Sequence, residues 1–251
     1  MRLATITLGT PEIFAAPQGE GPSAGEDCVF VRLSQCNLHC VWCDTPYTWN
    51  FQGTAFAHRD DRPSGPSKYD RGGETVDLTV DQLARQLMSQ TCRRLVITGG
   101  EPLLQQGEVS ALCAALKQAD PGWTIEIETN GTIRPRPDVA ALIDQFNVSP
   151  KLAHSGNASE IALKPAVLAW YASEPSAVFK FVVAQPGDLE EVERILAGCG
   201  MPASRTWLMP EGTDSKTINA RLPWVREAAA AQGFNVSDRL HIHAHGDKRG
   251  T

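Results

Sequence analysis

The sequence predicts an α/β protein built as a partial (β/α)6 barrel of the TIM-like type. Two observations carry this prediction: apolar, strand-like runs alternate with amphipathic segments, and glycine-rich or polar motifs follow several of the apolar runs directly. Strand–helix–strand units pair their strands in parallel through right-handed crossovers, so functional side chains are expected at the carboxyl ends of the strands. A length of 251 residues suits a single domain over 1–251.

Each element has its own justification in the pattern. Short apolar runs predict strands at 28–34, 94–98, 124–128, 146–149, 177–183, 206–209 and 239–244. Longer periodic segments predict helices at 79–91, 107–119, 137–144, 164–171, 187–198 and 215–232. In the first helix Leu83 and Leu87 share one face, and Thr79 or Asp81 would cap its amino end.

Residues 51–77 interrupt this rhythm. The stretch is rich in Gly, Pro, Asp and Arg and shows no hydrophobic period. It predicts a long loop inserted into the barrel, either a lid over the site or a solvated insertion.

Composition excludes several classes of function. A net charge of −6 gives no general basic surface for nucleic acid. No apolar run is long enough to predict a membrane span, and the N-terminus shows no signal pattern. Seven cysteines, an odd number, suggest no disulfide framework, so we expect a reducing, cytoplasmic setting.

Three cysteines lie close together in a CxxxCxxC run, at Cys36, Cys40 and Cys43. Three thiolates leave a zinc site short of its usual fourth ligand, although a zinc knuckle or three incidental buried thiols is the alternative. They can hold three irons of a 4Fe–4S cluster and leave the fourth iron open for a ligand. The remaining cysteines are interpreted as small buried hydrophobes; they are Cys28, Cys92, Cys113 and Cys199.

Two further motifs follow the next two strands. The run Thr98–Pro102, Thr-Gly-Gly-Glu-Pro, follows an apolar strand, and its glycines let the backbone approach a ligand closely. Alternation places Glu126 and Glu128 on one strand face, toward the mouth of the barrel. CxxxCxxC followed by Gly-Gly-Glu resembles the radical S-adenosylmethionine enzymes. In that family the open iron binds the methionine moiety, and the reduced cluster cleaves the sulfonium to a 5′-deoxyadenosyl radical.

A narrower resemblance extends over nearly the whole chain. Its residues are Glu12-Ile13-Phe14, Gln18-Gly19-Glu20-Gly21, Cys43-Asp44-Thr45, Ser149-Pro150-Lys151 and the ending His241-Ile242-His243-Ala244-His245. With these the sequence resembles the 7-carboxy-7-deazaguanine synthase family. The resemblance implies a carbon–nitrogen lyase that converts 6-carboxy-5,6,7,8-tetrahydropterin to 7-carboxy-7-deazaguanine with loss of ammonia, a step toward queuosine and other deazapurines. It also implies a 4Fe–4S cluster, S-adenosylmethionine that is regenerated, Mg²⁺, a flavodoxin- or ferredoxin-type reductant and a homodimer.

The resemblance assigns roles to individual residues. The expected pterin contacts are Pro17, Gln18, Gly19, Arg32, Thr98, His245 and the terminal carboxylate of Thr251. The expected S-adenosylmethionine contacts are Trp42, Cys43, Asp44, Gly100, Ser149, Pro150, Lys151, Met209, Pro210, Glu211 and Gly212. Thr45 is the expected magnesium ligand, and Arg32 and His245 are the candidate catalytic residues, Arg32 through a fork suited to a carboxylate.

Alternative interpretations remain open at this point. If 239–244 is a strand, His241, His243 and His245 share one face, which allows a metal site or simply solvated histidines. A glycyl-radical activating enzyme would share the cluster and the barrel but act on a partner protein. A non-enzymatic zinc or iron–sulfur module would need neither the Gly-Gly-Glu turn nor a barrel.

Overall fold

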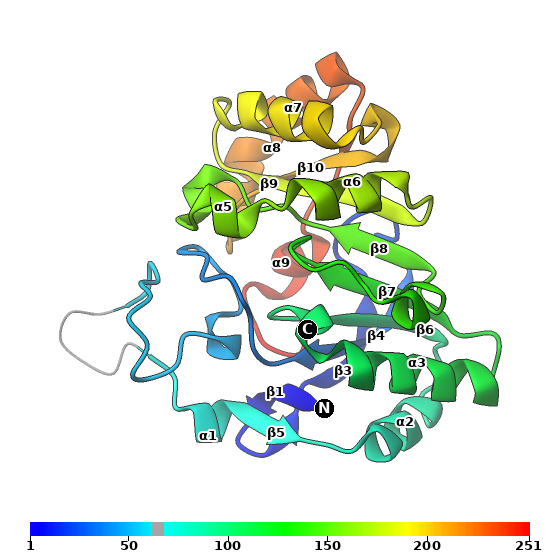
Figure 1. Ribbon diagram of the computed structural model, residues 1–251. Coiled ribbons are helices and arrows are strands. Elements are labelled where there is room, and N and C mark those ends of the chain that lie inside the picture. The colour runs from blue at the N-terminus through cyan, green and yellow to red at the C-terminus, as the bar shows by residue number, and fades with distance from the viewer. Residues whose placement is uncertain (62–67) are drawn as a thin grey trace.

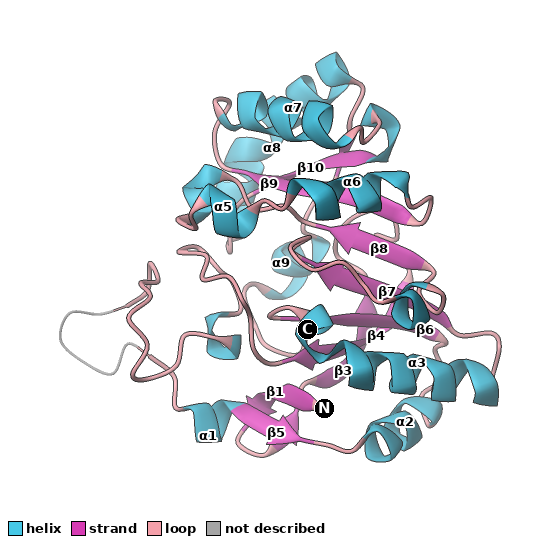
Figure 2. Cartoon of the chain, in the orientation of Figure 1, coloured by secondary structure: helices cyan, strands magenta, loops and turns pink. Residues whose placement is uncertain are grey.

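The computed structural model describes residues 1–61 and 68–251, and its strands form one curved sheet (Figures 1 and 2). Its central strands are parallel neighbours, in the order β10-β9-β8-β7-β6-β4. Their bounds are β4 Asp27–Leu33, β6 Arg94–Gly99, β7 Thr124–Thr129, β8 Gln145–Val148, β9 Ala177–Val183 and β10 Thr206–Pro210. A short strand β11, Asn235–Val236, extends the sheet beyond β10. The predicted partial (β/α)6 barrel is confirmed.

Helices follow these strands along the chain and pack on the outer face of the sheet. They are α2 Val80–Met88, α3 Gln106–Ala119, α4 Pro137–Ala140, α5 Ser159–Ala162, α6 Pro165–Ser173, α7 Asp188–Cys199 and α8 Ser215–Gln232. Single 3-10 turns lie at Pro46–Thr48, Pro102–Gln105, Ala153–Ser155 and Ala203–Arg205.

Local sequence explains where these helices begin and end. Helix α2 starts with a capping box, in which Thr79 Oγ1 accepts from the Gln82 amide at 3.1 Å and Gln82 Oε1 accepts from the Thr79 amide at 2.8 Å. The predicted helix 137–144 is too long, because α4 ends at Ala140. Asp144 already donates its amide to Ile125 of the sheet at 2.9 Å.

Side chains alternate strictly along the parallel strands. Apolar positions packed against the helices are fully buried, among them Val31, Leu95, Ile127 and Phe179. The intervening positions face the inside of the barrel and carry its charged and polar side chains, among them Arg32, Thr98, Glu128 and Lys180, beside apolar ones such as Phe30 and Val182. This alternation separates a hydrophobic core from an interior that holds the charged side chains.

An antiparallel extension at the N-terminal side was not predicted. It consists of β1 Arg2–Thr7, β2 Thr10–Pro11, β3 Ile13–Pro17 and β5 Thr75–Asp77. Strand β3 pairs along β4, and β5 pairs with β1. The expectation of one unstructured loop over 51–77 is therefore wrong at its end, where α1 Arg71–Glu74 leads into β5. Residues 62–67 of that loop lie outside the described residues.

The predicted strand 239–244 is also wrong, because Leu240–His245 form the helix α9. The last strand of the sheet is β11, and the chain turns into a helix after it, with the Ile242 amide donating to Arg239 at 3.0 Å. The apolar alternation is misleading, since Ile242 is buried while Leu240 is 44% exposed. On this helix His243 lies two positions from each of the other two histidines, so the three cannot share one face as they would on a strand.

Within the described part of the chain, none of the helices combines the length and the apolar character that a bilayer crossing would need.

Candidate active site

A cavity of about 350 Å³ lies inside the barrel, at the carboxyl ends of the parallel strands. Figure 1 shows the same strand ends facing the segment between β4 and β5. The walls of the cavity come from four parts of the chain. They are the cysteine-containing segment between β4 and β5, the ends of β6 to β10, the turn after β3, and the C-terminal segment from α9 onward. The site is therefore assembled from parts of the chain that are far apart in sequence.

Cys36, Cys40 and Cys43 all line this cavity as free thiols. Amide groups are aimed at two of the sulfurs: the Leu38 amide lies 3.5 Å from Cys36 Sγ, and Asn157 Nδ2 lies 3.3 Å from Cys40 Sγ. N–H groups directed at sulfur are typical of iron–sulfur sites, where they tune the cluster potential. Burial raises the pKa of Cys43 to about 11, so the thiolate that iron needs is favoured only by a bound cation.

The donor set fits an iron–sulfur cluster better than a single ion. Among residues 1–61 and 68–251, no three His, Cys, Asp or Glu side chains converge as they would around one metal ion. A mononuclear zinc site needs that convergence, whereas a cubane cluster takes its thiolates at separate corners. In the same part of the chain, Trp42 Nε1 is buried without a hydrogen-bond partner and Trp42 lines the cavity, so a bound group would supply the missing acceptor.

The Gly99-Gly100 pair was expected to let a ligand approach the backbone, but in the structure it lets another backbone segment approach. A Cβ on Gly99 would lie 2.0 Å from the Leu33 carbonyl oxygen, and one on Gly100 would lie 1.9 Å from the Gln35 carbonyl oxygen. Gly99 also has φ +132°, which disfavours other residues. The two glycines therefore admit the backbone that leads into the cysteine loop, and Gly100 also lines the cavity.

Glu101, the third residue of this motif, ties neighbouring strand ends together. Its buried carboxylate accepts from Thr129 Oγ1 at 2.9 Å and from the Asn130 amide at 2.8 Å. Asn130 Nδ2 in turn donates to Asn37 Oδ1 of the cysteine loop at 2.9 Å. Burial raises the pKa of Glu101, and these donors offset part of that effect.

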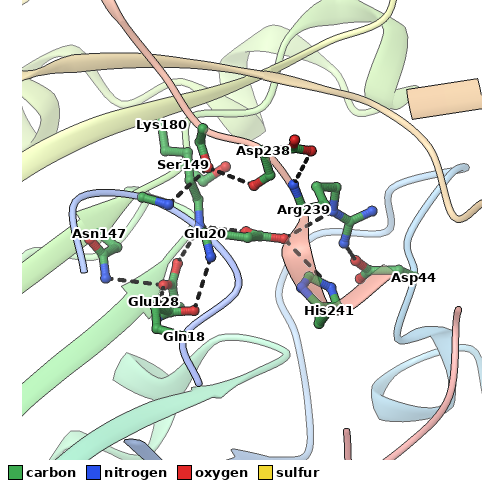
Figure 3. A network of polar contacts seen from close by, with 12 residues as sticks. Gln18, Glu20, Asp44, Glu128, Asn147, Ser149, Lys180, Asp238, Arg239 and His241 are labelled. Carbon is green, nitrogen blue, oxygen red and sulfur yellow. Dashed lines mark hydrogen bonds and ion pairs between the residues drawn. The ribbon is translucent and has the colours of Figure 1, made fainter. Parts of the chain in front are cut away.

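A buried network of charges forms another wall (Figure 3). Lys180 Nζ, on β9, donates to Glu20 Oε2 at 2.7 Å and to Glu128 Oε2 at 2.9 Å. Arg239 Nε donates to Glu20 Oε1 at 2.9 Å, and its Nη2 pairs with Asp44 beside the cysteine loop. Although burial acts to raise it, the pKa of Glu20 is held below its usual range by Lys180 and Arg239. Burial raises the pKa of Glu128, because Lys180 offsets only part of the desolvation.

Most residues predicted for the site line the cavity. They are Pro17, Gln18, Gly19, Arg32, Cys36, Cys40, Trp42, Cys43, Asp44, Thr45, Thr98, Gly100, Ser149, Lys151, Met209, Glu211, Gly212 and Thr251. Pro150 and Pro210 are not among the lining residues, and neither is His245.

The structure places His241, not His245, against the cavity. His245 is exposed, whereas a Cβ on Gly19 would lie 2.1 Å from His241 Nδ1. The pterin contact that the family resemblance implies for His245 is therefore not supported, because the side chain is exposed on α9 and does not line the cavity. The same close approach explains why position 19 is glycine.

Sequence reasoning missed several charged lining residues, notably Lys180, Arg239 and Arg249. Lys180 carried one signal, a lone lysine inside the apolar run Val178–Val183. Such a charge is seldom buried without partners. Arg239 and Arg249 carried no signal, because their partners lie in other segments.

An open barrel with three cysteines on a loop at the carboxyl ends of its strands defines a radical S-adenosylmethionine enzyme. The chain matches the Radical SAM superfamily over residues 31–155.

More specific relatives extend over the whole chain. It is 36% identical over 249 residues to the 7-carboxy-7-deazaguanine synthase of Pyrobaculum aerophilum, covering 98% of this chain and 99% of the relative. It is 34% identical to the protein of that name from Hyperthermus butylicus, covering 94% and 92% of the two chains. The crystal structure of QueE from Escherichia coli superposes with a TM-score of 0.64 at 25% identity, covering 94% of each chain. The chain belongs to the 7-carboxy-7-deazaguanine synthase family.

Proposed function

We propose that this chain catalyses the radical-mediated ring contraction of 6-carboxy-5,6,7,8-tetrahydropterin to 7-carboxy-7-deazaguanine with release of ammonia. The observation that carries the proposal is that similarity to the named synthases covers almost the full chain, cavity included. The product would serve queuosine and related deazapurine biosynthesis.

The cofactors would occupy the side of the cavity that holds the cysteine loop. Cys36, Cys40 and Cys43 would hold a 4Fe–4S cluster, which supplies the electron that cleaves S-adenosylmethionine. The lining residues that would contact S-adenosylmethionine are Trp42, Cys43, Asp44, Gly100, Ser149, Lys151, Met209, Glu211 and Gly212.

The pterin would bind deeper, between the turn after β3 and the C-terminal segment. Arg32 would hold the substrate carboxylate, with Gln18, Gly19 and Thr98 along the same wall. His241 replaces His245 as the candidate histidine contact. Fixing the carboxylate also fixes the adjacent carbon–hydrogen bond, which must face the radical for transfer to be efficient.

Magnesium would sit beside the substrate carboxylate, with Thr45 as a protein ligand. Thr45 lines the cavity, and its hydroxyl does not cap the 3-10 turn that follows. The hydroxyl lies 3.6 Å from Cys43 Sγ, and its oxygen can still accept a ligand cation. A hard cation with few protein oxygens would take its other ligands from substrate and water. Family membership alone supports the expected flavodoxin- or ferredoxin-type electron donor, the homodimer and the cytoplasmic location.

A deciding experiment is turnover by the anaerobically reconstituted protein with carboxytetrahydropterin, reductant, Mg²⁺ and substoichiometric S-adenosylmethionine. We expect several molecules of 7-carboxy-7-deazaguanine per molecule of S-adenosylmethionine, and none from Cys40→Ala. Cluster-loaded protein that cleaves S-adenosylmethionine but leaves the pterin unchanged would overturn the proposal. That result would favour the alternative, activation of a glycyl-radical protein.

A further inference from the structure

The first half of the insertion, residues 54–61, lies against the cysteine loop. The Arg59 amide donates to the Val41 carbonyl at 2.8 Å, and His58 Nε2 lies 2.8 Å from the Cys43 carbonyl oxygen. The rings of Phe56 and His39 stack with their centroids 3.4 Å apart. Three contacts therefore join this segment to the loop that carries the cluster thiols.

The turn around His58 is built to hold these contacts. His58 is 5% exposed, and its Nδ1 accepts from the Asp60 amide at 3.2 Å. Because Nδ1 accepts, Nε2 carries the hydrogen and donates to the Cys43 carbonyl. The Asp61 carboxylate closes the turn, since it accepts from the His58 amide at 3.0 Å and from Asn50 Nδ2 at 2.8 Å.

The Arg59 side chain reaches from this turn to the end of β10. Its Nη1 donates to Glu211 Oε1 at 2.7 Å, and its Nη2 donates to Thr213 Oγ1 at 3.1 Å. The other oxygen of the Glu211 carboxylate pairs with Arg221 of α8. Glu211 lines the cavity and is nearly buried, and two arginines, one on each carboxylate oxygen, set the position of its carboxylate.

We propose that residues 54–61, of which Asp60 lines the cavity, support the S-adenosylmethionine site from outside, with His58 and Arg59 as positioning residues. His58 fixes the backbone beside Cys43, and Arg59 orients the Glu211 carboxylate toward the bound cofactor. A small molecule that spans the cluster and the strand ends needs both supports at a fixed separation, and this segment links them directly. The inference rests on the proposed contact between Glu211 and S-adenosylmethionine.

The Arg59 part is tested by the dissociation constant for S-adenosylmethionine in reconstituted protein. Arg59→Ala is expected to raise this dissociation constant about tenfold, because a misplaced Glu211 carboxylate would lose one hydrogen bond to the cofactor. The dissociation constant of Arg59→Lys should lie between those of the wild type and Arg59→Ala. An ammonium can pair with Glu211 but lacks the fork that also reaches Thr213. Arg136→Ala is the matched control, since Arg136 pairs with the exposed Asp138 at the surface. Iron content and melting temperature are expected to stay at the level of this control.

Two results would overturn this part. One is a dissociation constant for Arg59→Ala within about twofold of the wild type, which is less than one lost charged hydrogen bond. The other is weakened binding that only parallels a loss of iron or of melting temperature, which is the signature of a general structural role.

Glu211→Gln separates this inference from the proposed function. If it leaves S-adenosylmethionine affinity unchanged, the Glu211 contact fails and the inference fails with it, while wild-type turnover of the pterin is unaffected. If Glu211→Gln weakens binding but Arg59→Ala does not, only the role of Arg59 fails. Coupled residues should also be non-additive, so the double variant should be scarcely weaker than Glu211→Gln alone.

The His58 part is tested by the rate at which a chelator removes iron from the reconstituted protein. His58→Ala is expected to lose iron several-fold faster, whereas His58→Gln, whose amide can donate to the same carbonyl, should stay near the wild type. Wild-type rates in both variants would show that His58 does not hold the loop. Equally fast iron loss from His58→Ala and His58→Gln would show that the hydrogen bond from His58 to the Cys43 carbonyl is not what retains the iron.

Discussion

Arg32 donates its Nε–H to the carboxylate of Glu12 at 2.8 Å, and Glu12 is fully buried. The hydroxyl of Tyr47 donates to the same carboxylate at 2.9 Å. Within residues 1–61 and 68–251 the terminal guanidinium nitrogens of Arg32 have no hydrogen-bond partner, and Arg32 lines the cavity. Glu12 therefore fixes the base of a fork whose tips are left for a ligand carboxylate.

This relationship makes Glu12 a positioning residue for substrate binding. Glu12→Gln should lower kcat/KM for the pterin by about ten- to a hundredfold, because displacing the Arg32 guanidinium, and with it the substrate, by about 1 Å has a cost of that order. Affinity for S-adenosylmethionine should not change. The control is Tyr47→Phe, which removes one donor to Glu12 but leaves its charge opposite Arg32, and it should cost less. Equal losses for both cofactor and pterin would argue for general damage instead.

The cluster assignment makes a simple prediction. Cys36→Ala, Cys40→Ala or Cys43→Ala should each abolish the 4Fe–4S absorption and the activity, because no thiolate can be spared. Cys113→Ala, a change in the hydrophobic core, should keep the cluster even if it lowers stability. Iron and sulfide analysis after reconstitution decides. A full cluster signal in any of the first three variants would refute the ligand set.

Much of the fold could be predicted because its signals are local. The parallel strands and most of their covering helices follow from hydrophobic period and caps, as in α2. The antiparallel extension could not be predicted, because it depends on pairs such as Leu3 with Val76, which lie far apart in sequence. The helix α9 was missed since a short apolar alternation fits either structure until burial decides.

The residues of the site likewise divide into those with a local sequence signal and those without one. The position of motif residues such as Cys36 and Thr98 at the cavity was predictable, because each belongs to a short run with its own chemistry. Lys180 was not, because its role depends on Glu20 and Glu128 reaching it from two other segments. A buried charge is interpretable only once its partners are known.

Lys180 provides a test of that buried network by stability. Lys180→Ala should destabilise the protein by about 3–5 kcal/mol, because it strips Glu128 of its cationic partner inside the barrel. The matched control is Lys117→Ala, since Lys117 pairs with Asp144 at 2.8 Å near the surface, and it should cost at most about 1 kcal/mol. Urea unfolding of the reconstituted proteins measures both. Similar losses for the two lysines would mean that the network adds no more than a surface pair.

His241 predicts a pH dependence of stability. Burial lowers the pKa of His241, and the Glu20 carboxylate, 3.9 Å away, offsets only part of this. As the pH falls below about 6.5, the unfolded chain takes up the proton before the folded chain does, so the free energy of unfolding decreases. His241→Gln should remove part of this decrease, as measured by urea unfolding at several pH values from 7.5 to 5. If both proteins lose stability in parallel, His241 does not contribute.

Thr45 carries the magnesium prediction. Its Oγ1 lies 3.6 Å from Cys43 Sγ, and it makes no capping bond to the 3-10 turn at Pro46–Thr48. Loss of a cap is thus no explanation for an effect of Thr45→Ala. We expect this variant to lower activity by up to about a hundredfold and to weaken its dependence on Mg²⁺, with cluster content and S-adenosylmethionine binding intact.

The magnesium response itself is the measurement that matters. A neutral hydroxyl holds Mg²⁺ weakly, so the ion should bind well only when the pterin carboxylate is present, and Thr45→Ser should restore the response. Turnover is measured against Mg²⁺ concentration for the wild type, Thr45→Ala and Thr45→Ser. Thr48→Ala is a control from the same turn. The Thr48 hydroxyl already donates to the Thr45 carbonyl at 2.8 Å, so it is not expected to bind the metal. Identical magnesium curves for wild type and Thr45→Ala would remove Thr45 from the metal site.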